Sequence, residues 1–108
     1  MPRKTVPFQV EQVLKELGHN IRKARVRRNI SLAEMAGRLG VHRTLLSDVE
    51  NGKPGTSIAA YAGMLWAMDL LPGLQAVADP ESDSHGLALA SREERERASS
   101  PRGMDNDF

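Results

Sequence analysis

SLAEMAGRLGVHRTLLSDVENG, residues 31–52, decides the fold of this chain. Its first half repeats apolar residues at i, i+3, i+4 and i+7, the spacing that forms one apolar face on an α-helix. These residues are Leu32, Met35, Ala36 and Leu39. Ser31 and Glu34 form an S-x-x-E capping box at the start of that helix. Gly40 can adopt the positive φ that ends a helix, so we predict a short helix that turns sharply there.

A second short helix is predicted directly after this glycine turn. Its inward-facing residues are Leu45, Leu46 and Val49. It closes at Asn51-Gly52, where glycine fits the left-handed position past a helix end. Val41 is the apolar residue expected between the two helices. Helix, glycine turn and helix together predict a helix-turn-helix, the motif that DNA-binding proteins dock in the major groove.

The charges of the chain are divided unevenly between its two halves. Residues 1–55 contain 11 Lys and Arg against 5 Asp and Glu, a net charge of +6, whereas residues 56–108 contain 4 against 9, a net charge of −5. Because the basic half carries the predicted helix-turn-helix, a polyanion is the expected partner, although charges alone also fit a solvated surface.

Composition excludes several other classes of protein. The chain has no cysteine, so it has neither a disulfide framework nor a thiolate metal site, which fits a reducing cytoplasm. The longest apolar run, Ile58 to Met68, is about half of the roughly 20 residues that span a bilayer, so no membrane segment is expected.

Helical patterns are also found on both sides of the central stretch. Apolar spacing from Val10 to Ala24 predicts a first helix, with Gly18 as a weak point that separates a leading turn from the main helix. A fourth helix is predicted to begin after Thr56 or Ser57 as its cap and to continue through Met68. A short fifth helix is predicted from Pro72 to Asp79-Pro80.

The predicted fourth helix is apolar almost all round, and a soluble helix of this kind needs two packing partners. We expect Ile58, Tyr61, Ala62 and Leu65 to face the core. A second subunit is expected on the other sides, with simple tight packing as the alternative. The residues predicted to form this homodimer contact are Met64, Trp66, Met68, Leu74 and Val77.

The two ends of the chain are predicted to lie outside the folded domain. Residues 1–8 are a flexible arm whose Arg3 and Lys4 can reach DNA, residues 9–79 the DNA-binding and dimerisation domain, and residues 80–108 a polar, largely disordered tail. The apolar island Gly86 to Ala90 is expected to add a strand to a subunit or to lie in a groove of a partner. SREERERA, from Ser91, is expected to form no more than a transient helical turn.

Over about residues 13–70 the chain resembles the lambda-repressor-like (Xre, Cro/cI) helix-turn-helix domains. SLAEMAGRLGVH and LLSDVENG stand at the intervals of that family's T-Q-x-x-L-A-x-x-x-G-V-S and I-S-x-x-E-x-G motifs. The resemblance implies an all-α, five-helix DNA-binding domain with a flexible C-terminal tail, and an ion pair between Arg25 and Glu50. The chain departs from the pattern at Leu32, where the family has Gln, and at His42, where it has Ser.

The start of the second motif helix is the part that can enter the major groove of double-stranded DNA. The residues expected there are His42, Arg43, Thr44 and Ser47. Arg43 is the best candidate for base recognition, because a guanidinium can donate two hydrogen bonds to guanine. Asp48 either accepts from a base amino group, is held by a neighbouring cation, or points aside. Phosphate contacts are expected from Arg28, Ser31, Asn51 and Lys53.

An enzyme is not expected, because His19, His42 and His85 are dispersed and lack metal-ligand spacing; no catalytic residue, metal or cofactor is predicted. Three hypotheses for function remain: an autorepressing antitoxin, a free-standing phage-like repressor, and a helix-turn-helix used only for protein interaction. The G-x-S-I-A-x-Y-A-x-x-L-W-x-x-x-L-L run, residues 55–71, and the D-P-x-x-D-x-x-G-L-A-L run, residues 79–89, resemble HipB-like antitoxins. That resemblance implies a cytoplasmic, nucleoid-associated homodimer on a palindromic operator, with a HipA-like kinase toxin as partner.

Overall fold

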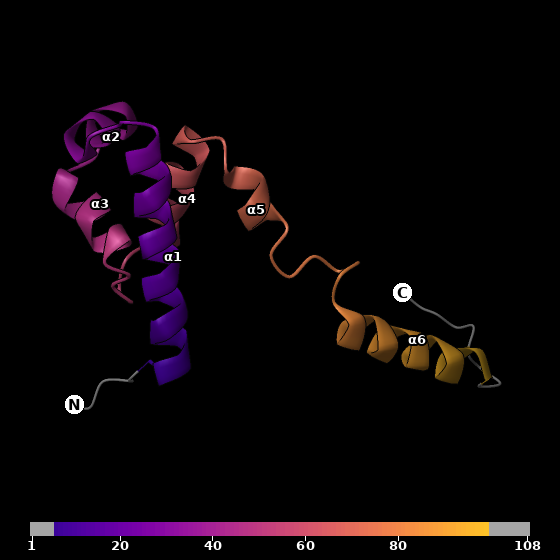
Figure 1. Cartoon of the computed structure of the whole chain (residues 1–108). Helices are drawn as coiled ribbons and strands as arrows, with labels where there is room; N and C mark the ends of the chain where they lie inside the picture. Colours follow the sequence, from indigo (N-terminus) through magenta and orange to yellow (C-terminus); the bar gives the residue numbers. More distant parts are fainter. Residues whose placement is uncertain (1–5, 100–108) are drawn as a thin grey trace. The chain divides into compact units, whose positions relative to one another are not determined.

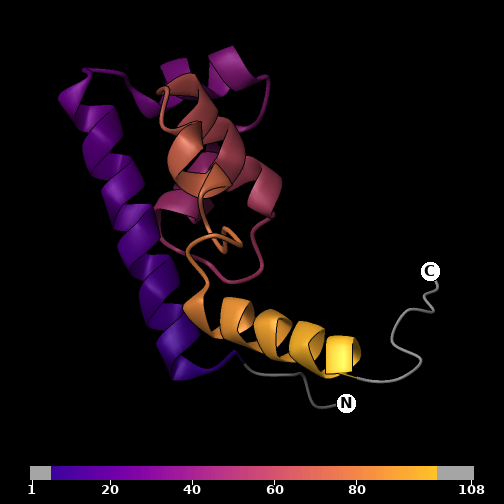
Figure 2. The same cartoon turned by 90° about the vertical axis from the view of Figure 1, so that its right-hand side faces the viewer.

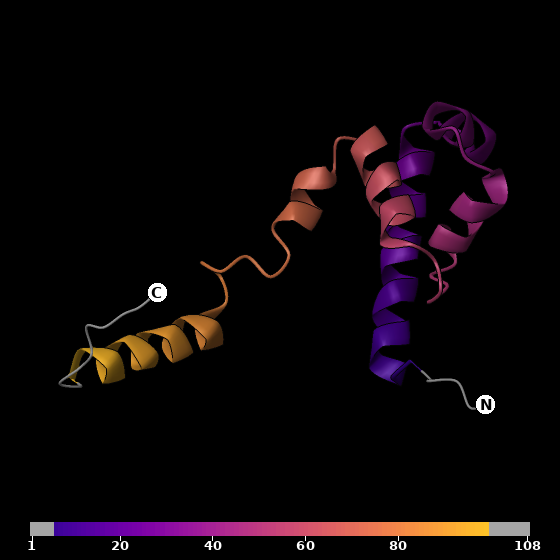
Figure 3. The ribbon, with the colours of Figure 1, turned by 180° about the vertical axis from the view of Figure 1, so that it is seen from behind.

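The computed structural model describes residues 6–99 and is all-helical over that range, as predicted (Figures 1 and 3). Its helices are α1 (Phe8–Arg27), α2 (Leu32–Leu39), α3 (Arg43–Glu50), α4 (Ile58–Ala67), α5 (Leu71–Gln75) and α6 (Ser84–Ser99). The predicted arm residues Arg3 and Lys4, and residues 100–108, lie outside the described range. No helix between residues 6 and 99 combines the length and the apolar character needed to cross a membrane.

The chain divides into two compact units after Leu74. In the first unit α3 packs against α1, α2 and α4, and α2 also packs against α4. Figure 2 shows α1 running along the side of this bundle. The side chains that meet in its core are Ile21, Ile30, Met35, Ala36, Leu46, Val49, Tyr61, Met64 and Met68. The helix that follows the glycine turn is therefore supported on three sides.

Helices α1 to α4 each end with a residue at positive φ. Gly40 and Gly52 take this conformation after α2 and α3, with φ of 67° and 65°. After α1 and α4 it is taken by Asn29 and Asp69, short polar residues that tolerate the left-handed region better than most. The residue that follows donates back to a carbonyl five positions earlier, as in Leu70 N–H to Leu65 O at 2.8 Å. This pattern caps the free carbonyl groups of each helix end.

The face of α4 that enters the core differs from the predicted one. Tyr61, Met64 and Met68 are buried, at i, i+3 and i+7, whereas Ile58 and Trp66 are 66% and 62% exposed. The prediction of Met64 and Met68 as dimer residues is therefore wrong: both pack inside their own domain. Because α4 is apolar on every side, its sequence periodicity could not select the buried face.

The buried face of α4 includes one polar side chain, the phenol of Tyr61. Its hydroxyl oxygen is buried and has no hydrogen-bond partner among residues 6–99. Burial raises the pKa of Tyr61, because the phenolate would lose its hydration in the core. An unpaired buried hydroxyl costs free energy, which the packing of the Tyr61 ring in the core offsets.

The C-terminal helices also differ from the predictions. Helix α5 ends at Gln75, short of Asp79, and residues 76–78 form a turn in which Ala78 has a φ of 60°. The predicted dimer residues Leu74 and Val77 are half-buried and exposed, respectively. Helix α6 covers both the apolar island and the SREERERA run, so the island is helical and not a strand. The Asp83 carboxylate accepts from the Gly86 N–H at 3.0 Å, and none of the α6 residues is buried.

Gly18 lies inside a continuous α1 and does not divide it, contrary to the prediction. It is buried where α1 crosses the end of α3. A Cβ atom at this position would lie 2.4 Å from Val49 O and 2.7 Å from Glu50 O. Both contacts are with backbone, which cannot rotate away as a side chain can. The glycine therefore sets how closely α1 approaches α3.

Gly18→Ala is expected to lower the free energy of unfolding by more than about 2 kcal/mol, because α1 must move away from α3. Urea denaturation followed by circular dichroism measures the change. Gly37→Ala in α2 is the matched control, since a Cβ there meets nothing within 4 Å. It should stabilise by up to about 1 kcal/mol through helix propensity. Equal effects of the two substitutions would show that the α1–α3 contact does not limit packing.

Candidate nucleic-acid interface

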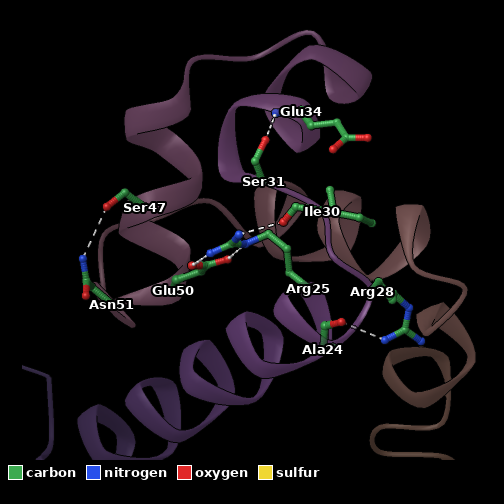
Figure 4. A network of polar contacts seen from close by, with 9 residues as sticks. All are labelled: Ala24, Arg25, Arg28, Ile30, Ser31, Glu34, Ser47, Glu50 and Asn51. Carbon is green, nitrogen blue, oxygen red and sulfur yellow. Dashed lines mark hydrogen bonds and ion pairs between the residues drawn. The ribbon is translucent and has the colours of Figure 1, made fainter.

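The first turn of α3 presents the residues predicted to contact bases. His42, Arg43 and Thr44 are exposed, and Ser47 is half-buried one turn later. His42 stands at the helix start with an extended backbone, but its side chain makes no capping hydrogen bond. The Asn51 amide donates to the Ser47 hydroxyl at 3.5 Å, at the end of the same helix (Figure 4). Arg43, Thr44, Ser47 and Asn51 thus share one side of α3.

The start of α2 forms a second polar edge. The Ser31 hydroxyl accepts a hydrogen bond from the Glu34 N–H at 3.0 Å, which is half of the predicted capping box (Figure 4). The Glu34 carboxylate turns outward and pairs with Arg38 at 3.1 Å, one turn along α2. Amide groups at such a helix start are suited to contact an anion. Ser31 is exposed, as a phosphate contact requires.

Arg25 connects the two motif helices to α1 from inside the domain. Its Nε and Nη2 atoms donate to the two carboxylate oxygens of Glu50, at 2.7 and 3.0 Å. Its Nη1 atom donates to the carbonyl oxygen of Ile30 at 2.8 Å (Figure 4). The side chains of Arg25 and Glu50 are only 11% and 7% exposed. Hydrogen bonding to Glu50 raises the pKa of Arg25, against the lowering effect of burial.

Arg28 was predicted to contact phosphate, but its side chain is bonded within the domain. Its guanidinium donates to the carbonyl oxygens of Ala24, at 2.9 Å, and of Met68, at 3.4 Å. In Figure 4 it lies across Arg25 from Ser47 and Asn51. The side chain therefore ties the end of α1 to the end of α4. This arrangement favours a structural role for Arg28.

Lys53 and Asp48 form an ion pair beside α3, with Lys53 Nζ 3.1 Å from Asp48 Oδ1. Of the possibilities left open for Asp48, the structure contains the one in which a neighbouring cation holds its carboxylate. No residue was named from the sequence as the partner of Asp48, and Gly18 was predicted only as a weak point of the first helix, so its contact with α3 was missed. No group of three metal-binding side chains is found over residues 6–99.

This helical arrangement and exposed α3 define a helix-turn-helix domain. A family model described as a helix-turn-helix domain matches residues 16–76, more than half of the chain, so the protein belongs to this family. The chain is 40% identical over 58 residues to the "ImmF control region 10 kDa protein" of Bacillus phage phi105. The matched segment is 52% of this chain and 64% of the phage protein, so the chain spans less than two thirds of its relative. No solved structure matches the chain.

Arg25→Ala is expected to lower the free energy of unfolding by about 3–5 kcal/mol, because it leaves the buried Glu50 carboxylate without a partner. Thermal and urea denaturation measure this loss. Arg38→Ala, which removes the exposed Arg38–Glu34 pair, should cost no more than about 0.5 kcal/mol. A similar loss from both substitutions would contradict a special role for the buried pair.

Proposed function

We propose that this protein is a sequence-specific, DNA-binding transcriptional regulator that uses α3 as its recognition helix. The observation that carries the proposal is the exposed first turn of α3, with Arg43 and Thr44 directed away from a core that holds α3 against α1, α2 and α4. Recognition helices contact base edges with their N-terminal residues. Membership of the helix-turn-helix family supports the same role.

We further propose that the protein binds a palindromic operator as a homodimer. Support comes from apolar side chains that α4 and the residues after it leave exposed: Ile58, Trp66 and Val77. Each of these side chains is large and apolar, so its burial against a partner subunit would be favourable. A two-fold dimer would present two recognition helices about 34 Å apart to successive major grooves.

The action proposed for this regulator is repression of its own control region. Likeness to a phage control-region protein favours a free-standing repressor. The antitoxin hypothesis, with a HipA-like kinase toxin as partner, is supported only by the resemblance of residues 55–71 and 79–89 to HipB-like antitoxins. Purification from the native cell separates the two hypotheses, because an antitoxin retains its kinase partner.

Arg43→Ala is expected to weaken binding to a selected duplex by about 1–3 kcal/mol and to relax the preference at one base pair. Selection from a random duplex library, followed by sequencing and fluorescence anisotropy, measures both effects. Arg22→Ala, an equal loss of charge at an exposed position of α1, is the control and should leave base preference unchanged. Wild-type protein that selects no sequence would refute the proposed function.

Trp66→Ala is expected to weaken self-association by more than about tenfold, the range of tryptophan hot spots. Sedimentation measures the association of the free protein. Trp66 is the only tryptophan of the chain, so its fluorescence should shift to shorter wavelength as wild-type protein dimerises. Phe8→Ala, at an exposed position at the start of α1, should have no such effect. A monomer at micromolar concentration that binds operator DNA one molecule at a time would contradict the dimer.

A further inference from the structure

Asp48 and Lys53 are joined through both side chain and backbone. Besides the 3.1 Å ion pair, the Lys53 N–H donates to the Asp48 carbonyl oxygen, also at 3.1 Å. Gly52, the residue before Lys53, has a φ of 65°. A Cβ atom at Gly52 would lie 2.6 Å from the carbonyl oxygen of Leu14 in α1. The backbone before Lys53 is therefore pressed against α1. Lys53 is held beside the end of α3 by its ion pair and by its backbone hydrogen bond to Asp48.

Lys53 is exposed and Asp48 is half-buried, so water reaches the ion pair and limits its effect on the fold. The side chains of Lys53 and Asp48 are 62% and 30% exposed. Exposed pairs of this kind contribute little to stability, because water screens the attraction and both side chains lose freedom. The helix end already has backbone hydrogen bonds of its own, including Gly52 N–H to Val49 O at 3.0 Å. We therefore consider how the two charges of the pair affect the surface around α3.

That surface is the one proposed to face DNA. Asp48 follows Thr44 by one helical turn and is adjacent to Ser47, so its carboxylate lies among the proposed recognition residues. The other acidic residue of α3, Glu50, is turned inward to Arg25. A carboxylate near the groove is repelled by phosphates of any sequence. The lysine that could have attracted those phosphates is already paired.

We infer that Asp48 is a specificity-determining residue that lowers the affinity of the α3 surface for duplex DNA of arbitrary sequence. It does so by neutralising Lys53 and by placing a negative charge beside the phosphates. A duplex of the correct sequence regains the loss where it offers the Asp48 carboxylate a base amino group as a hydrogen-bond donor, a contact that a random sequence does not supply. Discrimination against wrong partners by a repulsive group is a general route to specificity. The inference rests on the proposed DNA-binding function.

Asp48→Asn keeps the shape of the side chain, removes its charge and releases Lys53. Affinity for a synthetic random-sequence duplex should rise by about threefold to tenfold, as expected for the loss of one nearby repulsive charge in water. The dependence of log affinity on log salt should become steeper by about one unit, because Lys53 then displaces a counterion. Affinity for a duplex selected with the wild-type protein should rise less, so that the ratio of selected to random binding falls. Fluorescence anisotropy over a salt series measures all three quantities.

Two further variants separate local pairing from overall charge. Asp48→Asn combined with Lys53→Ala should bind random duplex like the wild type, because the local charge is again neutral. Asp69→Asn makes the same change in net charge at the opposite end of α4, and it should leave random binding unchanged. Asn is compatible with the positive φ at that position.

The inference is overturned if Asp48→Asn leaves random-duplex affinity unchanged while the wild type binds DNA. It is also overturned if Asp69→Asn raises that affinity equally, because net charge would then explain the effect. A wild type that binds no duplex refutes the proposed function itself, and the inference with it. Urea denaturation of Asp48→Asn should show stability close to wild type; a large loss would assign the pair to folding and overturn its role in discrimination.

Discussion

The bond between Arg25 and Glu50 is the interaction on which the rest of the first unit depends. A buried guanidinium and a buried carboxylate are each costly alone, but here every charged oxygen of Glu50 receives a donor and the remaining nitrogen is bound by Ile30 O. The three residues belong to α1, to the segment before α2, and to the end of α3. One charged side chain thus fixes the start of one motif helix relative to the end of the other.

The central stretch was predictable because its local signals agree with its packing. Ser31, Gly40 and Gly52 mark the helix boundaries, and Met35, Leu46 and Val49 are buried as their spacing indicates. The face of α4 was not predictable from a helix that is apolar all round, and packing alone selects Met64 and Met68. Gly18 was misjudged because its function is a tertiary contact with the α3 backbone. Helix α6 was missed because residues 80–108 were judged by whether they could bury apolar surface. The Glu, Arg, Ala and Leu residues of α6 favour a helix by local propensity, without burial.

The arginines show why charge counts describe an interface poorly. Arg25 is bound inside the domain and Arg28 caps the carbonyl ends of α1 and α4, so neither contributes a free donor to the α3 surface. Lys53 is partly neutralised by Asp48. Arg43 is therefore the one basic side chain that α3 itself contributes. The sequence identifies these residues as basic. Only the structure distinguishes the basic side chains that are bonded within the domain from those that are free to contact another molecule.

The close approach at Gly18 has a consequence for how new binding preferences can arise. The distance between α1 and α3 is set by backbone atoms, through Gly18 against the Val49 and Glu50 carbonyls and Gly52 against Leu14. Side chains on the outer side of α3 take no part in that contact. Substitutions at Arg43 or Thr44 can therefore accumulate over evolutionary time without altering the support beneath them. The support beneath α3 is thus independent of which side chains its outer surface carries.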